Sequence, residues 1–139
     1  MKVACIQMDV LQCRKQENLE KALHMALKAV RKGAELIVLP EVFSTGFCYE
    51  YLDHAAETLP SPLLENLACF SEANDCIIMG SVIEKVASEE TSNSGTPADF
   101  ENSTLSDSSN SPFYYNLGFC FESGALAGSY RKTHPFKHL

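Results

Sequence analysis

The sequence predicts an α/β protein built around a partly parallel sheet. An almost wholly apolar run at residues 35–39 is typical of a parallel strand that is buried on both faces. A stretch of helical period precedes this run, and a short apolar strand at residues 3–8 precedes that helix. A second helix and strand follow, and an aromatic hairpin lies at residues 113–131. This order predicts right-handed strand–helix–strand units followed by an antiparallel pair.

Composition bounds the class of protein. The 139 residues are enough for a single domain with a real core. The formal net charge of -7 argues against nucleic acid and membrane partners. No apolar run approaches the ~20 residues that span a bilayer, and Asp9 comes too early for a secretory signal. We therefore expect a soluble, cytoplasmic protein.

The first helix and the strand after it can be placed from the spacing of apolar residues. From Glu17 to Val30 these residues recur at three- and four-residue steps, which predicts one apolar helix face. Gly33 follows as a candidate cap at the C-terminus of the helix. Pro40 has no N–H to donate within a sheet, so the strand at residues 35–39 is expected to end there.

Glu41 comes directly after this strand. The carboxyl ends of parallel strands are where α/β proteins place their chemistry. Partial desolvation at that position is expected to raise the pKa of the Glu41 carboxyl toward the range useful to a general base. The alternative is a solvated glutamate at a strand end.

The loop after Glu41 is rich in aromatic residues. Phe47, Tyr49 and Tyr51 either line a pocket near the carboxylate or pack beneath the loop. Phe47 is the candidate substrate contact. Cys48 lies only seven residues past Glu41, so it is considered as a nucleophile.

A second helix–strand step follows this loop. Ser61 resembles an N-cap and Pro62 suits the first helical position, so the helix is predicted to run from there to about Ala73. Residues 76–83 then read as another buried strand. Residues 86–111 are dominated by Ser, Thr, Asn and acidic residues, and they are predicted to be a disordered surface insertion. The insertion is either a tolerated loop expansion or, through its serines, a regulatory segment.

The hairpin brings two polar residues into a mostly apolar region. Its strands are predicted at residues 113–121 and 125–131, joined by a turn. Asn116 lies within the first strand, so it needs hydrogen-bond partners and is expected to hold a loop in place. Lys132 ends the second strand, where a lysine is either solvated or part of a site.

The six cysteines show no CxxC pair or regular framework. Cys5, Cys76 and Cys120 fall within apolar strand-like runs, which fits reduced, buried thiols. We therefore expect neither disulfides nor a zinc site, and no metal or other cofactor.

Two motifs together resemble a known family. One comprises QMDV at residues 7–10, a helix that includes Asn18-Leu19, and GAELIVLPEVFSTGF at residues 33–47. The other is YYNLGFCFESGALAGSYRKTHPF at residues 114–136. In this order they resemble the N-terminal half of the nitrilase, or carbon-nitrogen hydrolase, superfamily. The resemblance covers residues 1–139, with residues 86–111 as an insertion, so the chain is expected to be one partial domain.

The resemblance implies a fold and a chemistry. The family fold is an α-β-β-α sandwich whose subunits usually pair, which suggests a homo-oligomer. Its site is a Glu-Lys-Cys triad, in which Glu41 would match the general base and Lys132 the lysine that stabilises the oxyanion. In such enzymes the cysteine attacks an amide or nitrile carbon, and water then hydrolyses the resulting thioester.

The sequence departs from this pattern at the nucleophile. It ends seven residues after Lys132, before the strand that carries the family's cysteine and before its second glutamate. We therefore expect the chain to be inactive alone toward a small amide or nitrile unless a complementing C-terminal half is present. The alternative is a non-catalytic half-domain that pairs with such a chain or with a full-length relative. A nucleotide-binding module is disfavoured because neither strand–helix junction carries a GxGxxG or phosphate loop.

Overall fold

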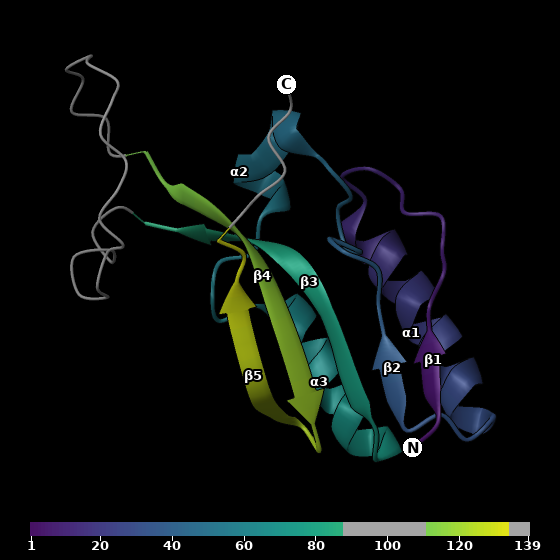
Figure 1. Ribbon diagram of the computed structural model, residues 1–139. Coiled ribbons are helices and arrows are strands. Elements are labelled where there is room, and N and C mark those ends of the chain that lie inside the picture. The colour runs from purple at the N-terminus through teal and green to yellow at the C-terminus, as the bar shows by residue number, and fades with distance from the viewer. Residues whose placement is uncertain (88–110, 134–139) are drawn as a thin grey trace.

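The computed structural model describes residues 1–87 and 111–133, which form one five-stranded mixed sheet with its two long helices on the same face (Figure 1). The elements are β1 (Val3–Cys5), α1 (Lys15–Arg31), β2 (Leu36–Val38), the 3-10 helix η1 (Tyr49–Tyr51), α2 (Leu52–Ala55), α3 (Pro62–Asn74), β3 (Ile77–Val86), β4 (Phe113–Glu122) and β5 (Ala125–Arg131). The strands lie in chain order across the sheet. β1, β2 and β3 are parallel, whereas β3–β4 and β4–β5 pair antiparallel. The predicted α/β alternation with a terminal hairpin is confirmed.

The first strand–helix–strand unit forms largely as predicted. α1 begins at Lys15, two residues earlier than the apolar period indicates. Beyond its last turn, Gly33 adopts φ +84° and its N–H donates to the Val30 carbonyl oxygen at 2.7 Å. Only glycine reaches this left-handed conformation without steric cost, so the predicted helix cap is confirmed.

The second unit also begins at the predicted cap. The Ser61 side-chain oxygen accepts a hydrogen bond from the Leu64 N–H at 3.3 Å, and Pro62 occupies the first turn. The helix ends at Asn74, and the capping residue Asp75 adopts φ 47°. β3 follows and extends to Val86, so the predicted start of the insertion falls inside an ordered strand. Of the rest of the predicted insertion, Ala87 and Ser111 are described, and residues 88–110 lie outside the described residues.

The core lies between the helices and one face of the sheet. Alternate strand residues face the helices, and they include Ile37, Ile78, Val82, Leu117, Phe119 and Phe121. On the opposite face Val3, Cys5 and Met79 are exposed, because no described element covers them. In β2 itself, Ile37 is buried in the core, whereas Leu36 and Val38 are half-buried. The prediction that residues 35–39 form a strand buried on both faces is therefore half right, and Cys5 is not the buried thiol that was expected. β5 is exposed along its whole length.

Among the described residues, no helix combines the length and apolar character that crossing a membrane requires.

Candidate active site

The sheet topology brings Glu41 and Lys132 to the same edge. Glu41 lies just past β2, and Lys132 follows β5 directly. Two successive antiparallel steps, β3–β4 and β4–β5, restore the chain direction, so β5 points the same way as β2. The Lys132 Nζ donates to the Glu41 Oε1 at 2.8 Å although the residues are 91 positions apart. The two site residues expected from sequence are therefore in direct contact.

Asn116 joins this pair, which sequence reasoning did not foresee. Its Nδ2 donates to the same Glu41 Oε1 at 2.7 Å. Its backbone carbonyl oxygen accepts from the Lys132 N–H at 2.9 Å. Asn116 was expected to hold a loop, and it does contact the segment after β2, through the Glu41 carboxylate itself. A polar residue inside an apolar strand was the signal that could have identified it.

The acidity of Glu41 differs from the expectation. The hydrogen bond from Lys132 is the main reason that the pKa of the Glu41 carboxyl lies below its ordinary value. Burial acts in the opposite direction, while the hydrogen bond from Asn116 and the positive charge of Lys132 lower the pKa further. The Glu41 side chain is 50% exposed, and the effect of its partial burial is outweighed by the Lys132 and Asn116 contacts. The predicted rise in its pKa is therefore wrong for this chain.

The backbone after Glu41 is held in an unusual conformation. Val42 adopts φ 50°, a region that β-branched residues rarely enter because of steric strain. Its N–H donates to the Ser81 Oγ at 2.9 Å, and its carbonyl oxygen accepts from the Gly46 N–H at 2.8 Å. Val42 is almost fully buried. These contacts fix the sharp turn on which the Glu41 side chain stands.

A cavity of about 740 Å³ opens beside the Glu41–Lys132 pair. Its described lining comprises Gln12, Glu41, Val42, Phe47, Tyr49, Leu52, Ile83, Tyr114, Asn116 and Lys132. The rings of Phe47 and Tyr49 pack against each other with centroids 5.9 Å apart. Phe47, the expected substrate contact, thus lies at the cavity, whereas Tyr51 is not among its described lining residues.

Tyr114 is tied into the cavity wall by a charged neighbour. Its hydroxyl donates to the Asp53 carboxylate at 2.6 Å, and Lys85 Nζ donates to the same oxygen at 2.7 Å. The hydrogen bond to Asp53 raises the pKa of the Tyr114 hydroxyl.

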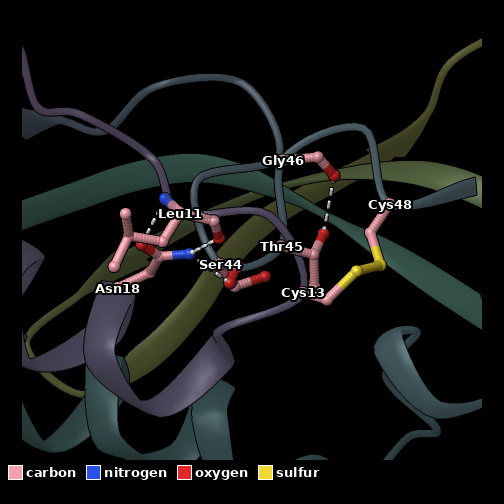
Figure 2. Close-up of a disulfide and its surroundings, with 7 residues drawn as sticks. All are labelled: Leu11, Cys13, Asn18, Ser44, Thr45, Gly46 and Cys48. Carbon is pink, nitrogen blue, oxygen red and sulfur yellow. Dashed lines mark hydrogen bonds between the residues drawn. A yellow bond between two sulfur atoms is a disulfide. The ribbon is translucent and has the colours of Figure 1, made fainter. Parts of the chain in front are cut away.

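A disulfide between Cys13 and Cys48 joins the two loops on one side of the cavity (Figure 2). The expectation that the chain carries no disulfide is therefore wrong. The pairing depends on a close approach of loops that are 35 residues apart in sequence, which spacing alone does not reveal. Cys48 has no thiol in this state, so it does not serve as the nucleophile that was considered.

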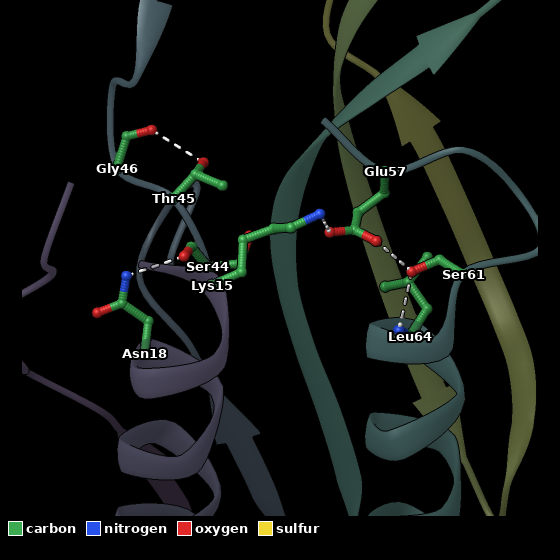
Figure 3. Close-up of polar contacts among 8 residues, drawn as sticks. All are labelled: Lys15, Asn18, Ser44, Thr45, Gly46, Glu57, Ser61 and Leu64. Atoms are coloured by element: carbon green, nitrogen blue, oxygen red, sulfur yellow. Dashed lines mark hydrogen bonds and ion pairs between the residues drawn. The ribbon is translucent and has the colours of Figure 1, made fainter. Parts of the chain in front are cut away.

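The Asn18 side chain also joins these two loops, through hydrogen bonds. Its side-chain amide donates to the carbonyl oxygens of Leu11 and Ser44 at 2.7 and 2.8 Å, and its Oδ1 accepts from the Leu11 N–H at 2.9 Å (Figures 2 and 3). Asn18 is fully buried at the start of α1. The loops after β1 and β2 are therefore anchored to one helix.

Two buried glutamates are ion-paired near the site. Glu57 accepts from Lys15 Nζ at 2.9 Å and from the Ser61 hydroxyl at 2.6 Å, which links the starts of α1 and α3 (Figure 3). Glu84 on β3 accepts two hydrogen bonds from the guanidinium of Arg131, at 2.7 and 2.9 Å. The second pair fixes the end of β5 immediately before Lys132.

The described lining of the cavity includes no free cysteine. The free cysteines are Cys5, Cys69, Cys76 and Cys120, and none is among the described residues that line the cavity. Burial raises the pKa of the Cys76 thiol, which disfavours its reactive thiolate. Across residues 1–87 and 111–133, no group of three or more His, Cys, Asp or Glu side chains is placed to hold a metal ion.

Comparison with known proteins identifies relatives of this chain. The family model described as carbon-nitrogen hydrolase matches residues 2–139. An omega-amidase from Xenopus tropicalis is 34% identical over 74 residues, which cover 51% of this chain and 26% of the relative. A nitrilase from Pyrococcus abyssi is 37% identical over 57 residues, which cover 41% of this chain and 22% of the relative.

The fold is shared with solved members of the nitrilase superfamily. The crystal structure of Saccharomyces cerevisiae Nit3 superposes with a TM-score of 0.72 at 20% identity, covering 96% of this chain and 44% of the Nit3 chain. The chain thus spans less than half the length of each of these relatives.

Proposed function

The chain belongs to the carbon-nitrogen hydrolase family, and on that premise we propose that it supplies the base and the oxyanion-stabilising cation for hydrolysis of a small amide or nitrile. The observation that carries this proposal is the Glu41–Lys132 pair beside the cavity. A carboxylate with a lowered pKa is ionised at neutral pH and so is able to accept a proton.

The two side chains have complementary roles in the proposed reaction. Glu41 removes the proton from an incoming cysteine thiol, and the thiolate attacks the carbon of the C–N bond. In this proposal the Lys132 ammonium stabilises the negative charge that develops on the oxygen or nitrogen of the substrate. From an amide, ammonia or an amine leaves directly; from a nitrile, water first adds to the thioimidate and ammonia then leaves. In both cases a second step, hydrolysis of the thioester by water, releases the acid.

The lining of the cavity favours a small substrate that has an apolar portion. Phe47, Leu52 and Ile83 provide apolar contacts, while Tyr114 and Asn116 provide polar ones. The names of the relatives, an omega-amidase and a nitrilase, agree with this substrate class. Phe47 is the residue that we assign to substrate contact.

The cysteine has to come from another polypeptide segment. All six cysteines of the sequence lie in the described residues; Cys13 and Cys48 are joined in a disulfide, and none of the six is among the described residues that line the cavity. We therefore propose that this chain has no turnover alone and acts when a complementing C-terminal half is supplied. Pairing of two such assemblies as a homo-oligomer would follow the family pattern.

Complementation tests this function. The chain is co-expressed with the C-terminal remainder of the Xenopus tropicalis omega-amidase, and ammonia release is measured on a panel of small amides and nitriles. The complex is expected to be active, and Glu41→Gln or Lys132→Met to abolish the activity. Glu50→Gln is the matched control, because Glu50 is exposed and outside the described cavity lining. Activity that survives Glu41→Gln would refute the proposal.

A second candidate function is non-catalytic pairing with a complementing chain. The exposed apolar side chains on the sheet face opposite the helices favour it. A stable complex that elutes as one species in gel filtration but shows no hydrolysis would support this alternative, whereas a well-folded monomer that binds no complementing half would contradict it.

A further inference from the structure

We infer that Asn116 is a positioning residue that, together with Lys132, holds Oε1 of Glu41 and leaves Oε2 as the proton-accepting oxygen. The inference rests on the proposed function, because it assigns an atom to the base in that reaction. It follows from where the two donors lie relative to the two oxygens of one carboxylate.

Both donors converge on the same oxygen. Asn116 Nδ2 and Lys132 Nζ lie 2.7 and 2.8 Å from Glu41 Oε1. A carboxylate oxygen has two lone pairs, so these two hydrogen bonds occupy Oε1. Among residues 1–87 and 111–133, no hydrogen bond is made to Oε2. Only Oε2 therefore has lone pairs available for a proton from the nucleophile.

Asn116 also fixes the place from which Lys132 reaches Glu41. Its backbone carbonyl oxygen accepts from the Lys132 N–H at 2.9 Å, so one residue contacts both members of the pair. Asn116 itself lies within β4, opposite Ile83 of β3. It is thus held by β3 on one side and by the Lys132 backbone on the other, and its side chain projects from a strand.

A neutral amide suits this role better than a second charge would. The torsion that turns a glutamate carboxylate is soft, and a single donor leaves the two oxygens able to exchange places. Two donors at different positions remove that freedom. The Asn116 amide supplies the second donor without adding charge beside the Lys132 ammonium.

The proton movements in the proposed step balance with this assignment. For an amide, the thiol S–H bond breaks and an O–H bond forms at Oε2. The sulfur electron pair forms the bond to the substrate carbon as the C=O π pair moves onto the oxygen, where the Lys132 ammonium stabilises it. Lys132 keeps its three protons throughout. The C=O bond then re-forms, the C–N bond breaks, and the neutral carboxylic acid returns the Oε2 proton to the departing nitrogen.

NMR titration of the 139-residue chain tests the inference without any turnover. With ¹³C in the Glu41 carboxyl and ¹⁵N in the Asn116 amide, both signals are followed as the pH is lowered. The Asn116 side-chain signal is expected to move with the same midpoint as the Glu41 carboxyl and to stop moving in Glu41→Gln. Asn116→Ala is expected to raise the pKa of Glu41, and Asn116→Asp to raise it further by like charge.

Asn66→Ala is the matched control, because Asn66 donates to the Pro62 carbonyl oxygen on α3, a contact separate from the Glu41 group. It is expected to leave the Glu41 titration unchanged. Should Asn116→Ala fail to fold, the wild-type amide signal and the nearly isosteric Asp variant still decide the matter. An Asn116 amide signal that ignores the Glu41 titration, or an unchanged Glu41 pKa in a folded Asn116 variant, overturns the inference. Either result leaves the proposed hydrolysis standing, since that stands or falls on the Glu41→Gln complementation assay.

Discussion

Removing the Cys13–Cys48 disulfide is expected to destabilise the chain by about 4 kcal/mol. The bond closes a loop with a sequence separation of 35 residues. In the chain-entropy description, a loop of that size restricts the unfolded chain by about 13 cal/mol/K, which is about 4 kcal/mol at 25 °C. The native loops retain other contacts, among them the Cys13 N–H bond to the Thr45 carbonyl oxygen at 2.9 Å. Most of the loss therefore comes from a freer unfolded state.

Urea unfolding followed by circular dichroism measures this loss. The double variant Cys13→Ala/Cys48→Ala is compared with wild type without reductant, and with wild type treated with a dithiol. The matched control is Cys5→Ala/Cys69→Ala, which removes two exposed free thiols and is expected to change the free energy of unfolding by less than about 0.5 kcal/mol. Equal stabilities of the oxidised and reduced wild type, or peptide mapping that finds both thiols free, would contradict this prediction.

Three further results are expected. Arg131→Met should lower the free energy of unfolding by about 3 kcal/mol in urea titrations, because it leaves the buried Glu84 carboxylate unpaired; a variant as stable as wild type would contradict this. The ion pair of Glu41 should stabilise the fold by less than about 1 kcal/mol, since it is half exposed. The pKa of Glu41 in the folded chain lies below the ordinary 4.5. The difference in free energy of unfolding between wild type and Glu41→Gln should therefore be fully present above pH 4.5 and should disappear as the pH falls through the folded pKa. Phe47→Ala should raise KM in the complemented complex, whereas Tyr51→Ala, a similarly exposed aromatic outside the described cavity lining, should not; equal effects would remove Phe47 from substrate contact.

Local patterns in the sequence were sufficient for most of the fold. The spacing of apolar residues, the glycine after α1 and the Ser61-Pro62 cap each act within a few residues, so helix and hairpin positions could be read directly. The uncovered sheet face could be anticipated only from the resemblance, because an apolar strand looks the same whether or not a second layer packs on it.

The chemistry of the site depended on contacts between distant residues. Glu41 and Lys132 were predicted as a pair from motifs, yet the lowered pKa of Glu41 comes from partners that β4 and β5 bring to it. The pairing of Cys13 with Cys48 likewise required the three-dimensional course of two loops. Neither the lowered pKa of Glu41 nor the Cys13–Cys48 pairing can be predicted from the spacing of residues along the chain.

The position of Asn18 affects how a mutational scan of this protein would be read. Asn18 is not among the described residues that line the cavity, yet its amide connects the two loops that carry Gln12 and Phe47. In a scan selected for activity, variants at Asn18 would be lost together with variants at residues that line the cavity, because both kinds of substitution displace the same cavity wall. A map of substitution tolerance alone would assign Asn18 to substrate binding. A separate measurement of the stability of each variant would distinguish this loop anchor from a residue that contacts substrate.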